Sequence, residues 1–271
     1  MSNIKYSVIQ TEDWSTISVI VDGEVYTATD TSHSNFDKIV EAARAGNPNV
    51  VNLFDLAAGA AKKFAEVTDR VTLVGNALHL DGEAIDNALS QKILEFMNEG
   101  LDFRPLVRFM INIADNPNAH SRKQLFDWMG AGHVTITEDG DIVAYKGVQS
   151  NLNSAHAGHG IVNGEVMNGY LPNLPGNIIE MDRGDVTFDP NSHCSTGLHV
   201  GTWSYASTFS QRTLEVHVNP SDVVSVPNDA SYQKMRVCRY RVVGDISQPY
   251  TDVVIPAEAP APVEEPSLTT F

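Results

Sequence analysis

The sequence predicts an α+β fold: hairpins and helices in an N-terminal part, an antiparallel β-rich C-terminal part, and a disordered acidic tail. Three observations support this fold class. β-branched residues alternate on both sides of tight-turn dipeptides such as Asp22-Gly23, which is typical of hairpins. From residue 86 to 129, apolar residues instead recur at helical spacing. At His133 the pattern changes back from helix to strand.

The change at His133 also divides the chain into domains. We expect a hairpin and helix domain at residues 1–132 and a β-rich α+β domain at 133–250, followed by a tail at 251–271. Past Tyr250 the chain is rich in proline and acidic residues and has no basic residue. This composition predicts a disordered segment.

In the N-terminal domain, a hairpin is expected at residues 16–29 and a second one around Gly75-Asn76. Between them, Phe36, Ile39 and Ala43 share one face of a helix that should end near Gly46. Another helix is expected from about Val50 to Phe64. Three further helices should fill residues 86–129.

The C-terminal domain should open with a third hairpin, whose turn lies at residues 138–141. The polar, glycine-rich stretch from Gln149 to Pro175 is predicted to be a functional or disordered loop. Further strands are expected at residues 177–181, 214–218 and 223–226, and a last one from Arg236 to Val243. Basic residues alternate with others from Lys234 to Arg241, which predicts a strand with one solvated cationic face.

Composition excludes several classes of protein. The 271 residues carry a formal net charge of -16, with a pI of about 4.8. An acidic surface disfavours nucleic acid and anionic lipid as partners, so we expect no nucleic-acid ligand. Two cysteines are too few for a disulfide framework, and the start MSNIKYSV lacks the apolar core of a secretion signal. No apolar run approaches the roughly 20 residues that span a bilayer. The sequence therefore predicts a cytoplasmic protein.

The stretch from Phe188 to Val200 has the highest density of candidate chemistry. Cys194 and His199 are candidates for a catalytic thiol and its base, because a nucleophilic cysteine needs an imidazole within hydrogen-bond reach. A spacing of five residues across a glycine turn does not make the two side chains meet. The alternative interpretation is a small buried thiol that holds a turn.

A zinc site is a second interpretation of this stretch. His193, Cys194 and His199 supply imidazole and thiolate ligands, and His156, His159 or His217 would have to complete the set. The spacing matches none of the standard zinc patterns. We therefore expect no metal and no other cofactor.

The order of elements also shows a faint resemblance to ADP-ribosyltransferase-like folds. The matching features are Tyr145-Lys146-Gly147, Ser195-Thr196 and the extended segment at 214–216. That resemblance implies a dinucleotide on the first strand and a late glutamate for the ribose. The corresponding late strand carries Lys234 and Arg236 instead. An analogy of fold does not establish function.

Four collinear blocks, spread over residues 15 to 245, resemble the rIIB-like proteins of tailed bacteriophages. The blocks are VDGEVY (21–26) with HSNF (33–36), ITEDG (136–140) with AYK (144–146), CSTGLHV (194–200), and VVSVP (223–227) with KMR (234–236). The resemblance implies a phage protein of the infected host that acts in lysis timing and in overcoming exclusion by resident prophages. It also implies an ATPase-like companion, rIIA, and a peripheral association with the inner membrane through that companion. The family carries no catalytic mechanism that could be transferred.

Together these observations favour a non-enzymatic phage accessory protein that acts in the host cytoplasm by assembly with itself or with a companion. The alternative is an enzyme or small-ligand (nucleotide) binding protein with a pocket in the C-terminal domain. Tyr145, Lys146, Ser195 and His199 are its expected ligand-binding residues, and Cys194 and His199 its candidate catalytic residues. A pocket of this kind requires Cys194 and His199 to lie beside the strand that carries Tyr145 and Lys146.

Overall fold

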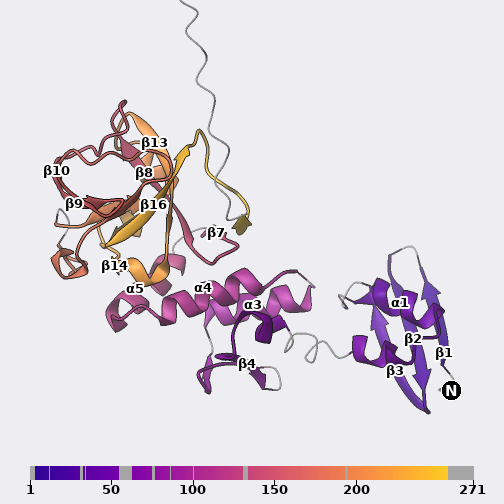
Figure 1. The fold of residues 1–271 in the computed structure, drawn as a ribbon. Helices are drawn as coiled ribbons and strands as arrows, with labels where there is room; N and C mark the ends of the chain where they lie inside the picture. The colour runs from indigo at the N-terminus through magenta and orange to yellow at the C-terminus, as the bar shows by residue number, and fades with distance from the viewer. Residues whose placement is uncertain are drawn as a thin grey trace, which may run out of the picture. The chain divides into compact units, whose positions relative to one another are not determined.

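The structure, a computed structural model, describes residues 4–11, 13–30, 33, 35–54, 63–74, 77–85, 87–99, 101–130, 134–192 and 195–255. The chain forms two compact units, an N-terminal unit, Met1–Val107, and a C-terminal unit, Arg108–Phe271. The division falls inside helix α4, Arg104–Ala114 (Figure 1). The domain boundary predicted at residues 132 and 133 lies outside the described residues and stays a prediction.

The N-terminal unit begins with a three-stranded antiparallel sheet in the order β1-β2-β3. Its strands are Lys5–Gln10, Ser15–Val21 and Glu24–Thr29, and helix α1, Phe36–Arg44, packs on one face (Figure 1). The core of this layer contains Ile17, Val19 and Ile39. The predicted hairpin and helix are therefore confirmed. Alternate residues of β2 and residues at helical spacing in α1 form one apolar face each, and these two faces pack against each other.

A second three-stranded sheet follows in the same unit. It consists of β4 (Val71–Val74), β5 (Ala77–Leu80) and β6 (Glu83–Ile85), so the predicted second hairpin is confirmed. The predicted helix from Val50 to Phe64 begins instead as the 3-10 helix η1, Pro48–Leu53, and residues 55–62 lie outside the described part.

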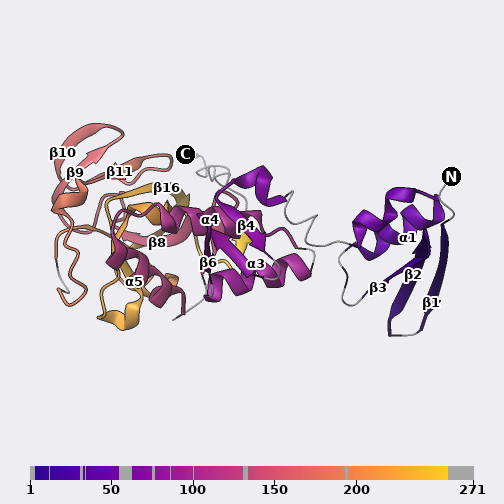
Figure 2. The same cartoon turned by 90° about the horizontal axis from the view of Figure 1, so that it is seen from below.

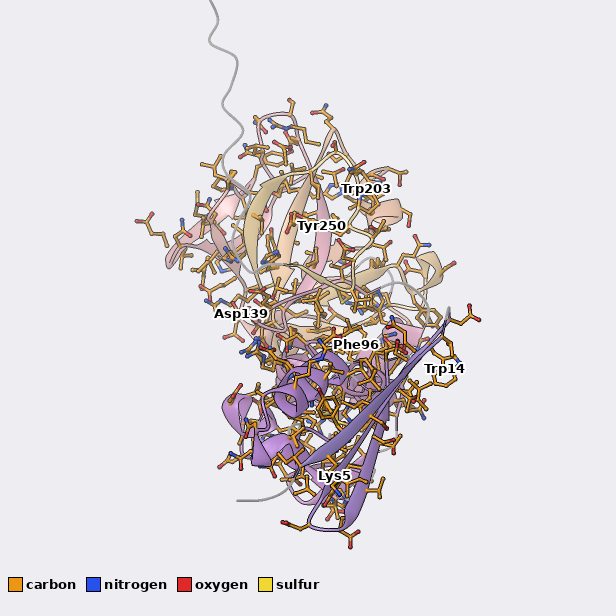
Figure 3. All side chains as sticks on the ribbon, turned by 90° about the vertical axis from the view of Figure 1, so that its right-hand side faces the viewer. Lys5, Trp14, Phe96, Asp139, Trp203 and Tyr250 are labelled. Carbon is orange, nitrogen blue, oxygen red and sulfur yellow. The ribbon has the colours of Figure 1, made fainter. Side chains whose placement is uncertain are left out.

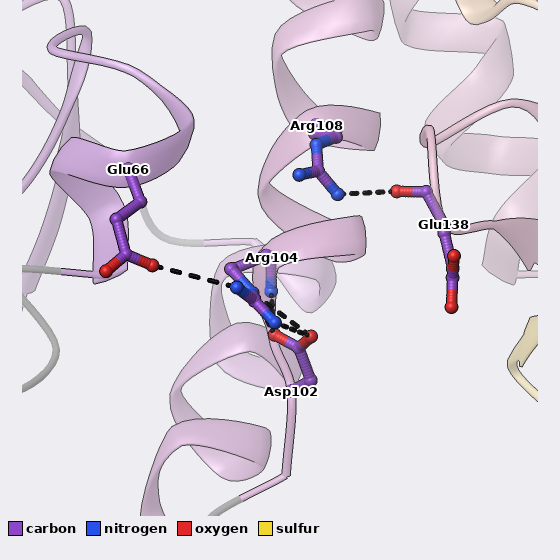
Figure 4. Close-up of polar contacts among 5 residues, drawn as sticks. All are labelled: Glu66, Asp102, Arg104, Arg108 and Glu138. Carbon is purple, nitrogen blue, oxygen red and sulfur yellow. Dashed lines mark hydrogen bonds and ion pairs between the residues drawn. The ribbon is translucent and has the colours of Figure 1, made fainter.

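The helices predicted between residues 86 and 129 are confirmed as α3 (Ala88–Asn98), α4 and α5 (Ala119–Gly130). Asn87 caps α3 by accepting from Ser90 N, and Ser90 returns a bond to the Asn87 backbone. Near the start of α4, Arg104 lies between Asp102 and Glu66, and one turn later Arg108 Nη1 donates to Glu138 O at 2.7 Å (Figure 4).

An 11-stranded sheet forms most of the described C-terminal unit, with a main order of β10-β9-β11-β16-β13-β8-β12-β15-β14 (Figure 2). All neighbours are antiparallel except β7 and β17, which pair in parallel beside β8. The strands are β7 (Ile136–Thr137), β8 (Ile142–Val148), β9 (Gly158–Val162), β10 (Glu165–Gly169), β11 (Ile178–Glu180), β12 (Leu198–Gly201), β13 (Arg212–Val218), β14 (Val223–Ser225), β15 (Lys234–Val237), β16 (Arg239–Asp245) and β17 (Val254–Ile255).

Short helices connect these strands, and α5 packs against the sheet edge at β14. The connections are η2 (Arg183–Asp185), α6 (Trp203–Ala206), η3 (Pro220–Asp222) and η4 (Ala230–Tyr232). Asn116, between α4 and α5, donates to Pro220 O at 2.9 Å and Val223 O at 2.7 Å. Ser121 Oγ in α5 donates to Val224 O at 2.7 Å. These buried hydrogen bonds connect α5 and the residue Asn116 before it to η3 and β14.

Two expectations for the C-terminal strands are corrected. The stretch from Gln149 to Pro175 contains the β9–β10 hairpin, which joins the sheet through β11. The single strand expected from Arg236 to Val243 is two strands that break at Cys238. Cys238 N donates to Asp222 O, and its own carbonyl accepts from Met181 N. At this residue β15, which pairs with β12 and β14, ends, and β16, which pairs with β13, begins.

The predicted solvated cationic face is wrong for half of the strand. Arg236 is fully buried and Lys234 is 6% exposed, whereas Arg239 is exposed and Arg241 is half-buried. Val254–Ile255, which were expected to belong to the disordered tail, form β17. Residues 256–271, where the rest of the disordered tail is expected, lie outside the described part of the chain.

Candidate functional site

The site begins where strands β8 and β12 separate. Their pairing is limited to one register position, Gly201 with Tyr145, whereas β8 pairs along its whole length with β13. Gly201 is also crowded by Gln233, since a Cβ at this position would clash with the Gln233 carbonyl oxygen. Beyond the shared position the two strands diverge, and each exposes part of its length to the same opening.

A cavity of about 740 Å³ fills this opening. That volume lies within the range of small-molecule sites. The β9–β10 region, η2, the turn before β12 and α6 supply the remaining walls. The lining residues include Tyr145, Lys146, Gly147, Ser154, His156, His159, Leu171, Met181, Asp185, Ser195, Thr196, Leu198, His199, Val200, Tyr205, Phe209, Lys234 and Tyr240.

Lys146 is the central polar group of the cavity. Its Nζ donates to His199 O at 2.8 Å and lies 5.2 Å from the centre of the Tyr240 ring. An ammonium group has three donors, and no described residue accepts a hydrogen bond from the other two. Burial lowers the pKa of Lys146 to about 8, so the group stays mostly charged at pH 7.

His199 lines the same cavity as Lys146 and is half-buried on β12. Burial is the main cause that lowers its pKa to about 4, and the charges of Lys146, Lys234 and Arg236 act in the same direction. The imidazole is therefore neutral at pH 7. A neutral ring offers one donor and one acceptor nitrogen to a ligand.

Three cations surround His199 in an otherwise acidic protein. Lys234 is one, and its Nζ donates to Asp229 Oδ2 at 2.6 Å. Arg236 pairs in register with His199 and donates to Ser192 O, to Asp189 O at 2.6 Å and to Ser225 Oγ at 3.1 Å. Arg236 thereby holds the segment that leads into the cavity wall, while its positive charge adds to that of Lys146.

Aromatic side chains line another part of the cavity. The rings of Tyr205 and Phe209 stack with centroids 5.7 Å apart, and the His156 ring meets Phe209 edge-on at 5.9 Å. Phe209 is 48% exposed, so a large part of this side chain remains open to solvent. Gly147 brings Phe209 close to β8, because a Cβ on Gly147 would lie 3.3 Å from Phe209 Cβ.

A second polar cluster occupies the opposite face of β8 and β13, where Tyr145 and Glu215 are register partners. Glu215 bonds His217 Nε2 at 2.8 Å and accepts from Tyr250 OH at 2.9 Å. His217 Nδ1 lies 3.0 Å from Arg241 Nη2, which can only donate, so His217 is the neutral Nε2–H tautomer. Trp203 and Tyr250 pack near Tyr145 beside this cluster (Figure 3).

Lys146, Ser195 and His199, which were expected to bind a ligand, all line the cavity. Tyr145 also borders it, but its side chain points to the opposite face of β8, where its hydroxyl accepts from Tyr250 N at 3.1 Å. His193 and Cys194 lie outside the described residues, so the proposed thiol and base pair stays a prediction. The other cysteine, Cys238, is buried beside Asp222 and Arg183, and burial raises its thiol pKa to about 11. Such a thiol is not a reactive nucleophile.

Three histidines of the zinc interpretation, His156, His159 and His199, line the cavity, but they do not form a cluster with metal-ligand geometry in the described part of the chain. His159 Nδ1 bonds Asn168 at 2.9 Å, and His217 belongs to the cluster on the opposite face. Among the described residues, no three His, Cys, Asp or Glu side chains form a group that could hold a metal ion.

The sequence pointed to His156 only through the zinc interpretation, and it did not assign Leu171 or Tyr240 to the site. The glycine-rich stretch from 149 to 175 was expected to be functional or disordered, and its residues 154–159 line the cavity. Tyr240 could not be identified from the sequence. It belongs to β16, and the sequence did not predict that the chain breaks at Cys238 and starts a new strand there.

The comparisons with known proteins agree with the four sequence blocks. The family model described as "Bacteriophage T4 protein rIIB" matches residues 2–259. This chain belongs to the phage T4 rIIB family. It is 33% identical over 246 residues to Protein rIIB of Enterobacteria phage T4, which covers 86% of this chain and 72% of the relative.

The comparison with solved structures returns no match. The similarity to ADP-ribosyltransferase-like folds therefore rests on the order of elements alone. In the rIIB-family chain described here, no helix within the described residues is long and apolar enough to cross a membrane.

Proposed function

We propose that this rIIB-family protein is a non-enzymatic accessory factor of phage infection that acts by protein assembly. Its role is the control of lysis timing or the evasion of exclusion and other host defences. It assembles with itself or with an rIIA-like ATPase companion in the host cytoplasm, where the companion provides peripheral contact with the inner membrane. Membership of the rIIB family supports the phage role.

The exposed edge of strand β1 is the observation that carries the assembly proposal. β1 lies at the end of its sheet and all six of its residues are exposed. They include Tyr6 at 45%, Val8 at 38% and Ile9 at 58% exposure. Trp14, 41% exposed, projects from the far end of the β1–β2 hairpin (Figure 3). An apolar strand edge with free backbone groups is a template for pairing with another chain.

The test is the mass of the intact assembly purified from infected cells, measured by native mass spectrometry. We expect an oligomer or a complex with a companion, and we expect the double variant Val8→Lys, Ile9→Lys to dissociate it. The control is Val25→Lys, at a 63% exposed position on β3. A solitary wild-type monomer would contradict assembly. A complex that survives the double variant would exclude β1 as the interface.

The cavity favours a second candidate function, the binding of a small ligand by Tyr145, Lys146, Ser195 and His199. The observation behind it is the set of unused donors on Lys146 inside a cavity of about 740 Å³. Replacement of both Cys194 and His199 by alanine tests whether this pocket serves the phage. A normal infection phenotype with a well-folded double variant would count against it.

A further inference from the structure

The cavity combines two features that recognise different parts of one molecule. One is the Lys146 ammonium group, with two donors that no described residue uses. The other is the exposed Phe209 ring, stacked on Tyr205. Both line the same cavity, but they lie on opposite faces of β8, because Phe209 packs over Gly147, whose Cβ direction is opposite to that of Lys146. Beyond Tyr145, β8 is not paired with β12, so a ligand at this open edge of β8 contacts both features.

The charge of the lining favours an anion. Lys146 and Lys234 line the cavity, Arg236 lies beside His199 on the neighbouring strand, and Asp185 is the only carboxylate among the described lining residues. Asp229 neutralises Lys234 through their 2.6 Å ion pair, which leaves Lys146 without a carboxylate partner in the described chain. A desolvated cation without a counterion is costly, and a bound anionic group would remove that cost.

The aromatic side chains favour a planar ring. The faces of Tyr and Phe stack on flat ligands at van der Waals distance, and nucleic-acid bases are bound in this way by aromatic side chains. Phe209 is backed by Tyr205 and held on its edge by His156, so its orientation is fixed before a ligand arrives. A fixed platform loses little conformational entropy when a ligand binds.

We propose that the cavity binds a free nucleoside phosphate, whose base stacks on Phe209 and whose phosphate is bound by Lys146. This proposal rests on the second candidate function, that the cavity is a ligand site. Neutral His199, which lines the same cavity, supplies a hydrogen bond to the sugar or the phosphate. The overall charge of -16 favours a free nucleotide over a polynucleotide, because a long phosphate backbone would also meet the acidic surface.

Isothermal titration of the full chain with separate parts of a nucleotide tests the proposal. The probes are the four ribonucleoside 5′-monophosphates, the corresponding nucleosides, ribose 5-phosphate and inorganic phosphate. We expect at least one monophosphate to bind about ten times more tightly than its nucleoside and than ribose 5-phosphate. If a monophosphate binds no more tightly than its nucleoside or than ribose 5-phosphate, the proposal that base and phosphate are both recognised is wrong.

Two variants assign the parts to their residues. Lys146→Met should weaken monophosphate binding by about tenfold or more and leave nucleoside binding unchanged. Phe209→Ala should weaken binding of both the nucleoside and the nucleotide by about tenfold, and Phe209→Trp should retain it. The controls are Lys123→Gln, exposed on α5, and Phe188→Ala, 62% exposed outside the cavity lining. The opposite pattern, or equal loss in the controls, would exclude these roles.

Two further outcomes separate this proposal from the function on which it rests. If no nucleotide binds, but the protein from infected cells retains another small molecule that Lys146→Met releases, the cavity is a ligand site and the nucleotide proposal is wrong. If nothing binds and nothing is retained, both are wrong. A 5′-phosphorylated RNA pentamer that binds more tightly than every monophosphate would overturn the choice of a free ligand.

Discussion

Strand β8 separates two groups of polar side chains, one shared with β13 and one shared with β12, and the two groups differ in how fully their hydrogen bonds are made. On one face, both oxygens of Glu215 and both nitrogens of His217 have partners. On the other face, Lys146 makes one hydrogen bond and His199 faces a cavity. Glu215 and His217 are buried, and Lys146 and His199 are half-buried, so the two groups differ in exposure as well as in their hydrogen bonds.

The difference indicates where function is located. A buried polar group that is satisfied by its neighbours fixes a single arrangement of the chain. A buried cation with spare donors destabilises the free protein, and this cost is recovered only when a ligand binds. The cluster around Glu215 is therefore structural, and the cavity around Lys146 is the candidate site. Four predictions test this distinction, in order of decreasing effect.

The largest effect is expected for Arg236→Ala. This change removes a fully buried guanidinium and leaves the carbonyls of Asp189 and Ser192 without their donor. The free energy of unfolding of the C-terminal unit should fall by about 3–5 kcal/mol. Urea denaturation followed by hydrogen exchange of β12 and β15 amides measures it. Arg239→Ala is the matched control, and its exposed pair with Glu180 should contribute less than about 1 kcal/mol.

Glu215→Ala should have the next largest effect. The substitution leaves His217 Nε2 and Tyr250 OH without their acceptor in a buried position. We expect a loss of about 2–4 kcal/mol in the same denaturation experiment. Ligand binding by the residual folded protein should not change, because Glu215 faces away from the cavity. A loss of binding at unchanged stability would instead place Glu215 in the site.

The third prediction concerns the loss of stability at acidic pH that His199 causes. The pKa of His199 falls from 6.5 to about 4 on folding, so the unfolded chain binds more protons between these pH values. Stability should therefore decrease as the pH falls from 6.5 towards 4, by about 1–3 kcal/mol from this group. His199→Gln should flatten the pH dependence of the urea midpoint in this window. An unchanged slope would show that His199 is not buried as the structure places it.

The smallest effect on stability is expected for Lys146→Met. Methionine retains the length of the side chain and removes a desolvated charge that has one hydrogen bond to the protein. The free energy of unfolding should stay within about 1 kcal/mol of wild type or rise. A loss as large as that of Glu215→Ala would remove the distinction between the two faces, because Lys146 would then be a structural group.

The local pattern was sufficient for much of the fold. Alternation predicted the strands β2, β3, β4, β5 and β8, and helical spacing predicted α1, α3, α4 and α5. The four ligand-binding candidates came from local blocks, and all four border the cavity, although the Tyr145 side chain points to the other face of β8. That they bind a ligand stays a prediction. The edge strand β1 and the β9–β10 hairpin were missed. In β1 all six residues are exposed, and β9 and β10 are rich in glycine and polar residues.

The sequence by itself therefore determined the α+β class, the rIIB family and four of the residues that line the cavity. Only the tertiary structure decided which faces are buried. Alternation along a strand predicts which residues share a face, but it does not predict which other element packs against that face. The break at Cys238 places Lys234 and Arg236 inside and Arg239 outside. The single register contact of β12 with β8 then opens the cavity. Both features depend on pairing between strands far apart in the chain, which no local pattern encodes.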